Sequence, residues 1–405
     1  MKKEQKSERG QALILIVFAI IGLIGITGLT VDGGLAYSDR RHAQNAADTA
    51  AYAAALAKVK GNDLNAAGLD VAEDNGYASS NVVITTAASP SGTCPAGSSN
   101  NLDITVTITS VMNTSFARVV GIDTMTNVVS ATSRACGTYI APLFNGNAIV
   151  GLNPSLTDCG FDSGNSNSAK WIVKGGGIFS NGCAFSKNGN SVTFDPGYCA
   201  SAVGTASNFS CSNNNQTSQK INYPADVLAI MPPNPCDGTP GDVGLPQPSP
   251  SGGSVTLSNG IYCISDFDAY DQKDIILDNA TMYVTDMDFK LKFAGGGGFS
   301  GTPTTSGVYN SYYMIVAYDA TPCTSFTSNN AQVVQWRGNG LGTLYGTVLA
   351  PSACIDYRGN ADGTAINSQL IGYNVSSNGT ADVFVSYKAN ENRRDPQPPT
   401  ISLIE

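Results

Sequence analysis

The chain has 405 residues, of which 42% are hydrophobic, so it is long enough for more than one domain and apolar enough for buried cores. Only 13% of the residues are charged and 44 are glycines, a composition that favours short strands and many turns over long solvated helices. The formal net charge of -9 repels phosphate backbones, so nucleic acid is not an expected partner.

Residues 10–31 form an uncharged, mostly apolar run that follows a short charged segment, residues 1–9. A helix of this length, with a rise of about 1.5 Å per residue, is about 30 Å long and can cross a bilayer. The apolar core of a cleaved signal peptide is usually shorter, about 7 to 15 residues, and no small-residue cleavage site follows the run. The run therefore predicts a retained, single-pass transmembrane helix that contacts membrane lipid.

The flanking charges predict how this helix is oriented. Lys2, Lys3, Lys6 and Arg9 precede the run. Basic flanks tend to stay in the cytoplasm. We therefore expect a cytoplasmic N-terminus and an extracytoplasmic body at the cell surface.

Small residues recur along the predicted helix and its continuation into residues 36–59. Three glycines are spaced by three residues, and alanines follow at spacings of three and four. Small residues on one face let another helix approach closely. The residues expected to pack this helix against other subunits are Gly22, Gly25, Gly28, Ala43, Ala46, Ala47, Ala50 and Ala54.

Three segments with alternating apolar residues follow the helix, at residues 81–88, 102–111 and 126–135. Alternation with many β-branched residues is typical of strands. We expect a small sheet that packs on the helix. Cys94 and Cys136 bracket these strands and could connect them by a disulfide.

Two segments carry a resemblance to a known family. In the first segment, residues 8–57, the resemblance is carried by Gly10, by Val31-Asp32-Gly33 at the end of the apolar run, by Arg40-Arg41, and by Gln44 to Asp48 with the alanine-rich stretch after them. In residues 101–135 they are Phe116-Ala117-Arg118 and Gly121-Ile122 between two strands. The chain resembles the N-terminal module of TadE/TadG-like proteins of the Flp (Tad) pilus-assembly system over about residues 8–137. The resemblance implies a pilin-like module at residues 32–137 and other pilus-assembly or pilin-like subunits as partners.

The sequence departs from the family pattern in two places. Prepilins that are cut after glycine carry a glutamate at the fifth mature position, where a cut after Gly10 would place Leu15. Larger TadG-type proteins often carry a von Willebrand A-type domain with an Asp-x-Ser-x-Ser metal site. The nearest string begins at Asp162 and has Gly164 where a serine is needed, so that domain is not predicted.

The remaining chain predicts a mainly-β body in two regions, residues 138–230 and 255–388. Short apolar runs end in Asn-Gly or Gly-Asn corners, which supply positive φ between strands. A Pro/Gly-rich linker, residues 231–254, separates the regions, and residues 389–405 are expected to be a flexible tail. The fold class is α+β, with a β-solenoid favoured for the body and a β-sandwich as the alternative.

Ten cysteines lie after the apolar run, without any C-x-x-C pair. An even number of scattered cysteines favours up to five disulfides in an oxidising compartment over zinc sites, with buried free thiols as the alternative. The candidates are Cys94, Cys136, Cys159, Cys183, Cys199, Cys211, Cys236, Cys263, Cys323 and Cys354.

Signals of catalysis are few. The single histidine, His42, argues against a His-dependent triad or a multi-His zinc site, and no cofactor motif is present in a suitable context. An acidic cluster gives calcium candidates, although it fails the EF-hand pattern. These candidates are Asp266, Asp268, Asp271 and Asp274. A cluster of tyrosines, Tyr309, Tyr312, Tyr313 and Tyr318, suits either sugar contacts or a β core.

These observations predict a membrane-anchored structural or accessory component of a Tad/Flp-type pilus or related surface apparatus, and not an enzyme. A surface adhesion or glycan-binding module on a pilin-like anchor is the first alternative, with a glycan or protein as its ligand. A polysaccharide-acting β-helix enzyme is the second, because paired carboxylates can cleave glycosides.

Overall fold

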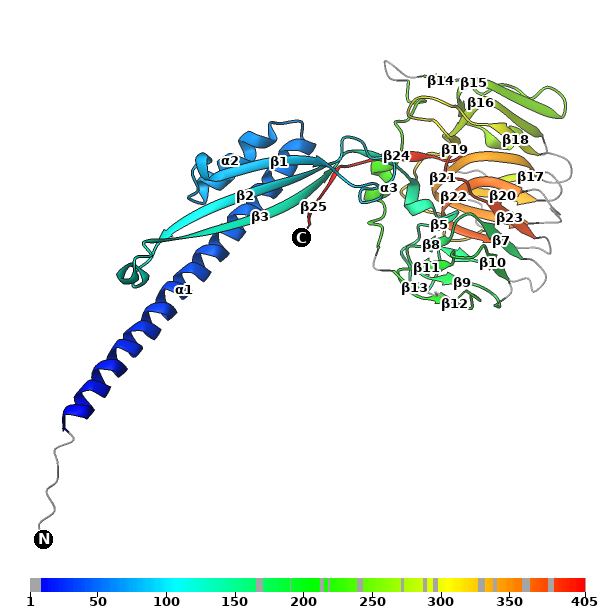
Figure 1. Ribbon diagram of the computed structural model, residues 1–405. Helices are drawn as coiled ribbons and strands as arrows, with labels where there is room; N and C mark the ends of the chain where they lie inside the picture. The colour runs from blue at the N-terminus through cyan, green and yellow to red at the C-terminus, as the bar shows by residue number, and fades with distance from the viewer. Residues whose placement is uncertain are drawn as a thin grey trace, which may run out of the picture. The chain divides into compact units, whose positions relative to one another are not determined.

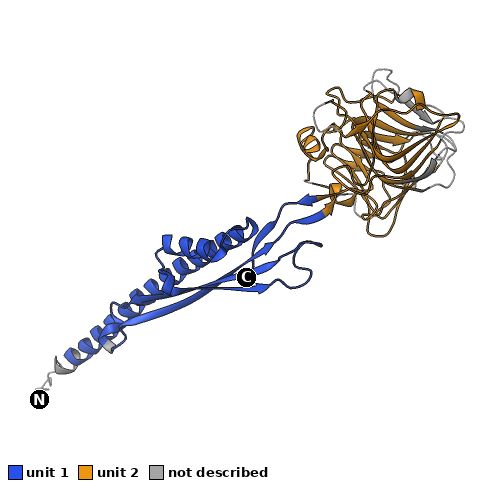
Figure 2. Ribbon diagram, turned by 90° about the horizontal axis from the view of Figure 1, so that it is seen from above, with its two compact units in different colours: residues 1–140, 396–405 blue, residues 141–395 orange. Residues whose placement is uncertain are grey.

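The computed structural model describes residues 9–164, 170–189, 191–211, 215–217, 219–238, 243–270, 273–286, 290–293, 298–326, 332–337, 341–358, 365–377 and 382–404. The chain divides into two compact units, shown in Figure 2. Unit 1 holds residues 1–140 and 396–405, and unit 2 holds residues 141–395.

Unit 1 begins with one uninterrupted helix, α1 (Arg9–Val59), of 51 residues. The predicted membrane helix therefore continues into the alanine-rich helix without a break (Figure 1). The shorter α2 (Leu64–Asp74) follows, and its N-terminal N–H groups are capped by Asp63, whose Oδ1 accepts from the Asn65 N–H at 2.8 Å. The 3-10 turn η1 (Ser79–Asn81) leads into the sheet.

The sheet of unit 1 has the strand order β1-β2-β3-β25, and all its pairs are antiparallel. Its strands are β1 (Val82–Ala88), β2 (Leu102–Asn113), β3 (Thr124–Cys136) and β25 (Thr400–Ile404), with the 3-10 turn η2 (Ala117–Val120) between β2 and β3. The small sheet expected from the sequence is therefore present.

The end of the chain corrects one prediction. Residues 389–405 were expected to be a flexible tail, but they contain β24 (Arg394–Gln397) and β25. β25 pairs with β3 from Cys136 opposite Thr400 to Thr132 opposite Ile404. Unit 2 is therefore an insertion in the sequence of unit 1, between β3 and β25.

Unit 2 is mainly β. β4 (Tyr139–Pro142) and β24 each include the last or first residues of unit 2 and form a two-stranded sheet. The strands of its large sheet are β5 (Ile149–Gly151), β6 (Phe161–Asp162), β7 (Trp171–Lys174), β8 (Ile178–Ser180), β9 (Ala184–Phe185), β10 (Val192–Phe194), β11 (Ala200–Ala202), β12 (Ala206–Ser207), β13 (Asn215–Gln216), β14 (Gly244–Leu245), β15 (Ser254–Ile264), β16 (Asp274–Val284), β17 (Lys290–Phe293), β18 (Phe299–Thr302), β19 (Tyr312–Val316), β20 (Val333–Arg337), β21 (Leu341–Arg358), β22 (Ala365–Ser377) and β23 (Val383–Ser386). The helical pieces are η3 (Leu143–Gly146), α3 (Ala225–Ile230) and η4 (Phe267–Tyr270).

The described pairings of this large sheet are parallel, which is not the pairing of β-hairpins. β5 pairs with β8, β8 with β11 and β11 with β13. β15 pairs with β16, which pairs with β18 and β19, and both of these pair with β21. β21 pairs with β22, and β22 returns to β5 (Figure 1).

The two β regions that the sequence separates are therefore parts of one sheet. The pairings run in the order β13, β11, β8, β5, β22, β21, β19, β16, β15 and β14, so the chain enters this series inside it at β5, runs to one end at β13 and restarts at the other end at β14. The predicted linker, residues 231–254, lies on this crossover and contains β14. The Cys236–Cys263 disulfide ties the crossover to β15.

The core of unit 2 is rich in aromatic side chains. Trp171 contacts Phe161 and Tyr357 edge to face, with ring centroids 5.4 and 5.5 Å apart. Tyr312 and Tyr313 are fully buried, and Tyr309 is 7% exposed. These three tyrosines fill the core, so the sugar-contact interpretation is not supported for them, and Tyr318 is half-buried.

Buried tyrosines predict that unit 2 loses stability at high pH. Burial raises the pKa of Tyr270, Tyr283 and Tyr387 to about 12 each. The ordinary value is about 10, so between about pH 10 and 12 the unfolded chain releases phenolic protons that the folded chain keeps. The contribution of these tyrosines to the free energy of unfolding is fully present below about pH 10 and is lost as pH rises toward 12. We expect the denaturant midpoint of the full chain to be lower at about pH 11 than at about pH 9, and equal midpoints would contradict this.

Candidate functional site

The first part of α1 is an exposed apolar surface. In this part of α1, large side chains on all sides of the helix are exposed, among them Leu23 at 64% and Leu29 at 77%. The Thr27 and Thr30 hydroxyls donate to the Leu23 and Ile26 carbonyls at 2.8 Å each, so they need no water. In the described part of the chain, α1 is the one helix that is long and apolar enough to cross a membrane.

The three regularly spaced glycines of α1, Gly22, Gly25 and Gly28, have different surroundings. A Cβ added at Gly22 or Gly25 would meet no atom within 4 Å apart from those of its own stretch of helix. A Cβ at Gly28 would lie 2.6 Å from the Phe116 Cβ, so this glycine is needed where the β2–β3 connection approaches the helix. Gly22 and Gly25 therefore remain open to another molecule, and Gly28 is used within the chain.

The alanine stripe packs inside unit 1, which corrects the expectation that it contacts other subunits. Ala43, Ala46, Ala47 and Ala50 are fully buried in one cluster with Val106, Ile108 and Val129 of the sheet. Ala54 is buried in a neighbouring cluster with Ile104 and Ala135. The stripe has small side chains because the sheet lies close to the helix.

Polar side chains fix the register between α1 and the β2–β3 hairpin. Asp39 accepts from the Ser110 hydroxyl at 2.8 Å and from the Asn127 amide at 2.7 Å. Gln44 donates to the Ser130 carbonyl at 3.2 Å. Residues further along α1 therefore contact residues of β2 and β3 that lie further from the β2–β3 connection, which is the tip of the hairpin. The tip consequently lies beside the apolar part of the helix.

Asp32 holds the tip against α1, a role that the sequence analysis did not assign. Its side chain is 4% exposed and accepts the backbone N–H groups of Ser115 at 2.7 Å, Phe116 at 3.0 Å and Ala117 at 2.6 Å. Three consecutive N–H groups around one carboxylate form an anion-binding turn. The structure thus joins the Val31-Asp32-Gly33 exit to the Phe116-Ala117-Arg118 segment. The sign of this role in the sequence was a single carboxylate directly after the apolar run.

All ten cysteines form disulfides, as predicted. The pairs are Cys94–Cys136, Cys159–Cys183, Cys199–Cys211, Cys236–Cys263 and Cys323–Cys354. The first connects the loop after β1 to the end of β3 in unit 1, and the other four lie in unit 2. The alternative of buried free thiols is wrong.

The calcium candidates are not gathered into a site in the described residues. Asp266 Oδ1 accepts from the Ala269 N–H at 3.2 Å, and Asp274 Oδ1 accepts from the Gly298 N–H at 2.8 Å. The backbone of Asp268 lies in η4, and Asp271 is outside the described residues. Among the residues that the structure describes, no three His, Cys, Asp or Glu side chains are placed to hold a metal ion.

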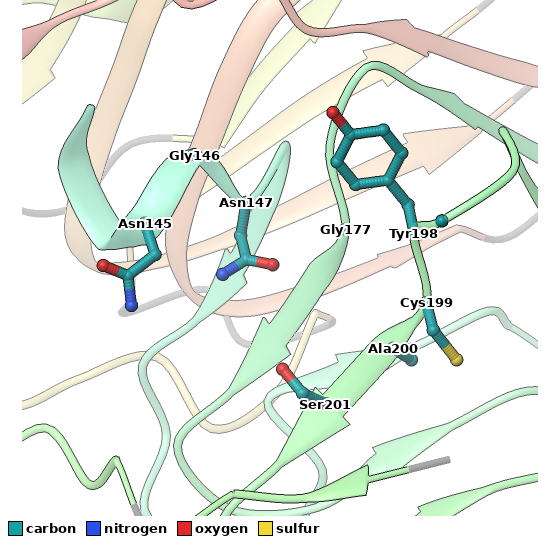
Figure 3. Close-up of a pocket in the computed structure, with 9 residues that line it drawn as sticks. Asn145, Gly146, Asn147, Gly177, Tyr198, Cys199, Ala200 and Ser201 are labelled. Atoms are coloured by element: carbon teal, nitrogen blue, oxygen red, sulfur yellow. The ribbon is translucent and has the colours of Figure 1, made fainter. Parts of the chain in front are cut away.

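A small pocket of about 240 Å³ lies in unit 2 and is lined by Asn145, Asn147, Tyr198 and Ser201, among others (Figure 3). The Asn145 amide donates to the Gln219 side chain and the Asn147 amide to the Phe144 carbonyl, both at 2.8 Å. Tyr198 is 43% exposed. A tyrosine ring beside amide groups can contact a sugar or a peptide.

The N-terminal part of the chain matches a known family. Residues 10–57 match the model of the Tad family, described as Flp pilus-assembly TadE/G-like. Searches of curated proteins and of solved structures found no match. The matched residues include the apolar part of α1 and the whole alanine stripe. Residues 10–57 of this chain are therefore similar to the TadE/G-like proteins of Flp pilus assembly.

Proposed function

We propose that the protein is a membrane-anchored structural or accessory component of a Tad/Flp-type pilus or a related cell-surface apparatus. The observation that carries the proposal is that the family match, residues 10–57, lies on one uninterrupted helix. The first part of that helix is exposed and apolar, and the second part packs on the sheet of its own unit. This division suits an anchor that continues into a folded pilin-like module.

The N-terminus is cytoplasmic in this proposal, and the rest of the chain after residue 31 is exported. Two observations support this orientation. Basic residues precede the apolar run. All five disulfides lie after it, and disulfides persist in oxidising compartments outside the cytoplasm.

Unit 2 is in this proposal a β-solenoid that unit 1 displays outside the membrane. Strands that are close in sequence pair in parallel, as the strands of successive solenoid turns do. Parallel neighbours need a crossover connection, which a solenoid turn provides. Asn259 and Asn279 support it too. Asn259 lies in β15 and Asn279 in β16, both have positive φ, and the residues on either side of them pair with each other. The Asn279 amide donates to the Asn259 side chain at 3.0 Å. Equivalent corners therefore stack on each other.

Assembly, and not catalysis, is the proposed action. Gly22 and Gly25 lie in the apolar run of α1 and are not covered by other described residues, so they provide a face where a neighbouring apolar helix can approach closely. The alanine stripe serves the fold of unit 1 and leaves this helix segment to make the contact between subunits.

Replacing Gly25 with leucine tests this mechanism. The Gly25→Leu variant should still fold and enter the membrane, because no described residue outside its own stretch of helix lies within 4 Å of the added Cβ. The added bulk should keep a neighbouring helix away and reduce the protein recovered in sheared surface filaments relative to membranes. Ile24→Leu, a change at an exposed neighbouring position, is the control. Equal recovery of both variants in filaments would contradict the mechanism.

A surface-binding body is the second candidate function. The pocket of Figure 3 favours it, because an exposed tyrosine and two asparagine amides line one concave surface. Binding of the full chain to a glycan array that is lost in Tyr198→Ala would favour this candidate over a purely structural role.

A further inference from the structure

The connection between β2 and β3, here called the tip loop (Thr114–Asp123), exposes apolar side chains. Val119 is 87% exposed, Ile122 is 51% exposed and Phe116 is 41% exposed. Most surface turns of a globular unit are polar, so three large apolar side chains on one short connection need a partner. The loop has two charged side chains, Arg118 and Asp123, which form an ion pair with an N–O distance of 3.3 Å.

The loop is fixed at the end of the apolar run of α1. A Cβ added at Gly28 would meet Phe116, and Asp32 accepts the N–H groups of Ser115, Phe116 and Ala117. Gly28 precedes Val31, the last residue of the run, by less than one helical turn, which is about 5 Å along the axis. The apolar surface of α1, with Ile26 at 67% and Leu29 at 77% exposure, thus continues onto the loop.

The backbone of the loop is largely satisfied without water. Beyond the three N–H groups bound by Asp32, four others donate to carbonyls of the loop itself at 3.0 to 3.1 Å. These are the N–H groups of Thr114, Val119, Gly121 and Ile122, which donate to Asp123, Phe116, Arg118 and Ala117. Burial in an apolar medium requires internal pairing of this kind. An ordinary solvated loop has no such need.

We propose that the tip loop is a second membrane contact of this protein, with Phe116, Val119 and Ile122 inserted between the headgroups and acyl chains of the outer leaflet. The inference rests on the proposed function, because it needs α1 to span the bilayer. Apolar side chains bury favourably at this boundary, and a neutralised Arg–Asp pair can remain at headgroup level. Lipid is the favoured occupant because the loop is continuous with the lipid-facing surface of α1 and lies level with its outer end.

This contact would fix the unit at the membrane by more than a single helix. A lone helix can rotate and tilt, whereas a helix and a loop attached to it by Asp32 define two points at the interface. The loop would thus orient unit 1 relative to the bilayer before assembly.

Photocrosslinking tests the proposal directly. The photoreactive residue benzoylphenylalanine is introduced at position 119 of the full chain, which is then reconstituted in vesicles of phosphatidylcholine and phosphatidylglycerol, illuminated and analysed by mass spectrometry. The same residue at Leu23 reports on the spanning helix. At Val83, which is 58% exposed and pairs with Thr107, it reports on a site of unit 1 roughly 20 Å further from the tip.

We expect lipid adducts at positions 119 and 23, and several-fold fewer at position 83. Lipid adducts at position 23 without adducts at 119 would overturn the tip-loop contact and leave the anchor standing. A crosslink from position 119 to a second copy of the chain would also overturn it, by showing that the loop is a protein interface. Absence of lipid adducts at both 23 and 119 would overturn the anchor as well, and with it the proposed function.

Discussion

Replacing both Cys94 and Cys136 with serine is expected to lower the free energy of unfolding of unit 1 by about 4 kcal/mol. The disulfide closes a segment with a sequence separation of 42 residues, which contains all of β2 and η2 and nearly all of β3. Without the bond the unfolded chain gains the conformational entropy of that whole segment. Cys136, at the end of β3, also lies opposite Thr400 of β25, so the pairing of β25 with β3 should loosen too.

Hydrogen exchange of the β2 and β3 amides in the full chain is the measurement for this variant. The matched control is the Cys199→Ser, Cys211→Ser variant, whose sequence separation is 12. Its shorter loop should cost less, about 3 kcal/mol, and should affect unit 2. Unchanged protection of β2 and β3 in the Cys94→Ser, Cys136→Ser variant would show that the bond does not support unit 1.

The Ala47→Leu variant is expected to destabilise unit 1 by about 3 kcal/mol. Ala47 is fully buried in the cluster that contains Val106, Ile108 and Val129. A leucine there must push α1 away from the sheet or adopt a strained rotamer, because close-packed interiors have little free volume. Displacing α1 would also disturb the contacts of Asp39 with Ser110 and Asn127.

The Ala66→Leu variant is the control for this packing effect. Ala66 lies in α2 of the same unit and is exposed, so the same chemical change should alter the free energy of unfolding little. Thermal unfolding of the full chain in detergent, followed by circular dichroism, compares the two variants. Equal unfolding temperatures would mean that the alanine face does not pack on the sheet in solution.

The N-terminal module was largely predictable because its signals are local. An uncharged run of membrane length and strands with two-residue alternation both follow directly from the order of residues. The alanine stripe was correctly expected to lie on a face of a helix. Its partner was assigned to another subunit, because small residues at helical spacing look the same whether a helix or a sheet approaches them.

Contacts between distant parts of the sequence could not be predicted in this way. β25 has only five residues and follows a polar, proline-rich segment, so its short alternation of apolar residues did not reveal that it pairs with β3. The return of β22 to β5 joins residues more than 200 positions apart, and no repeat period marks it. Asp32 was noticed as part of a family pattern, but its three N–H partners lie more than 80 residues away.

Protease treatment of intact spheroplasts tests the central claim most directly, that α1 anchors an exported body. The account predicts that added protease degrades the chain after residue 31 and leaves an N-terminal fragment that contains residues 10–31 in the membrane and resists alkaline extraction. A full-length chain that is cut only after the membrane is broken, or that alkaline extraction releases, would contradict the account.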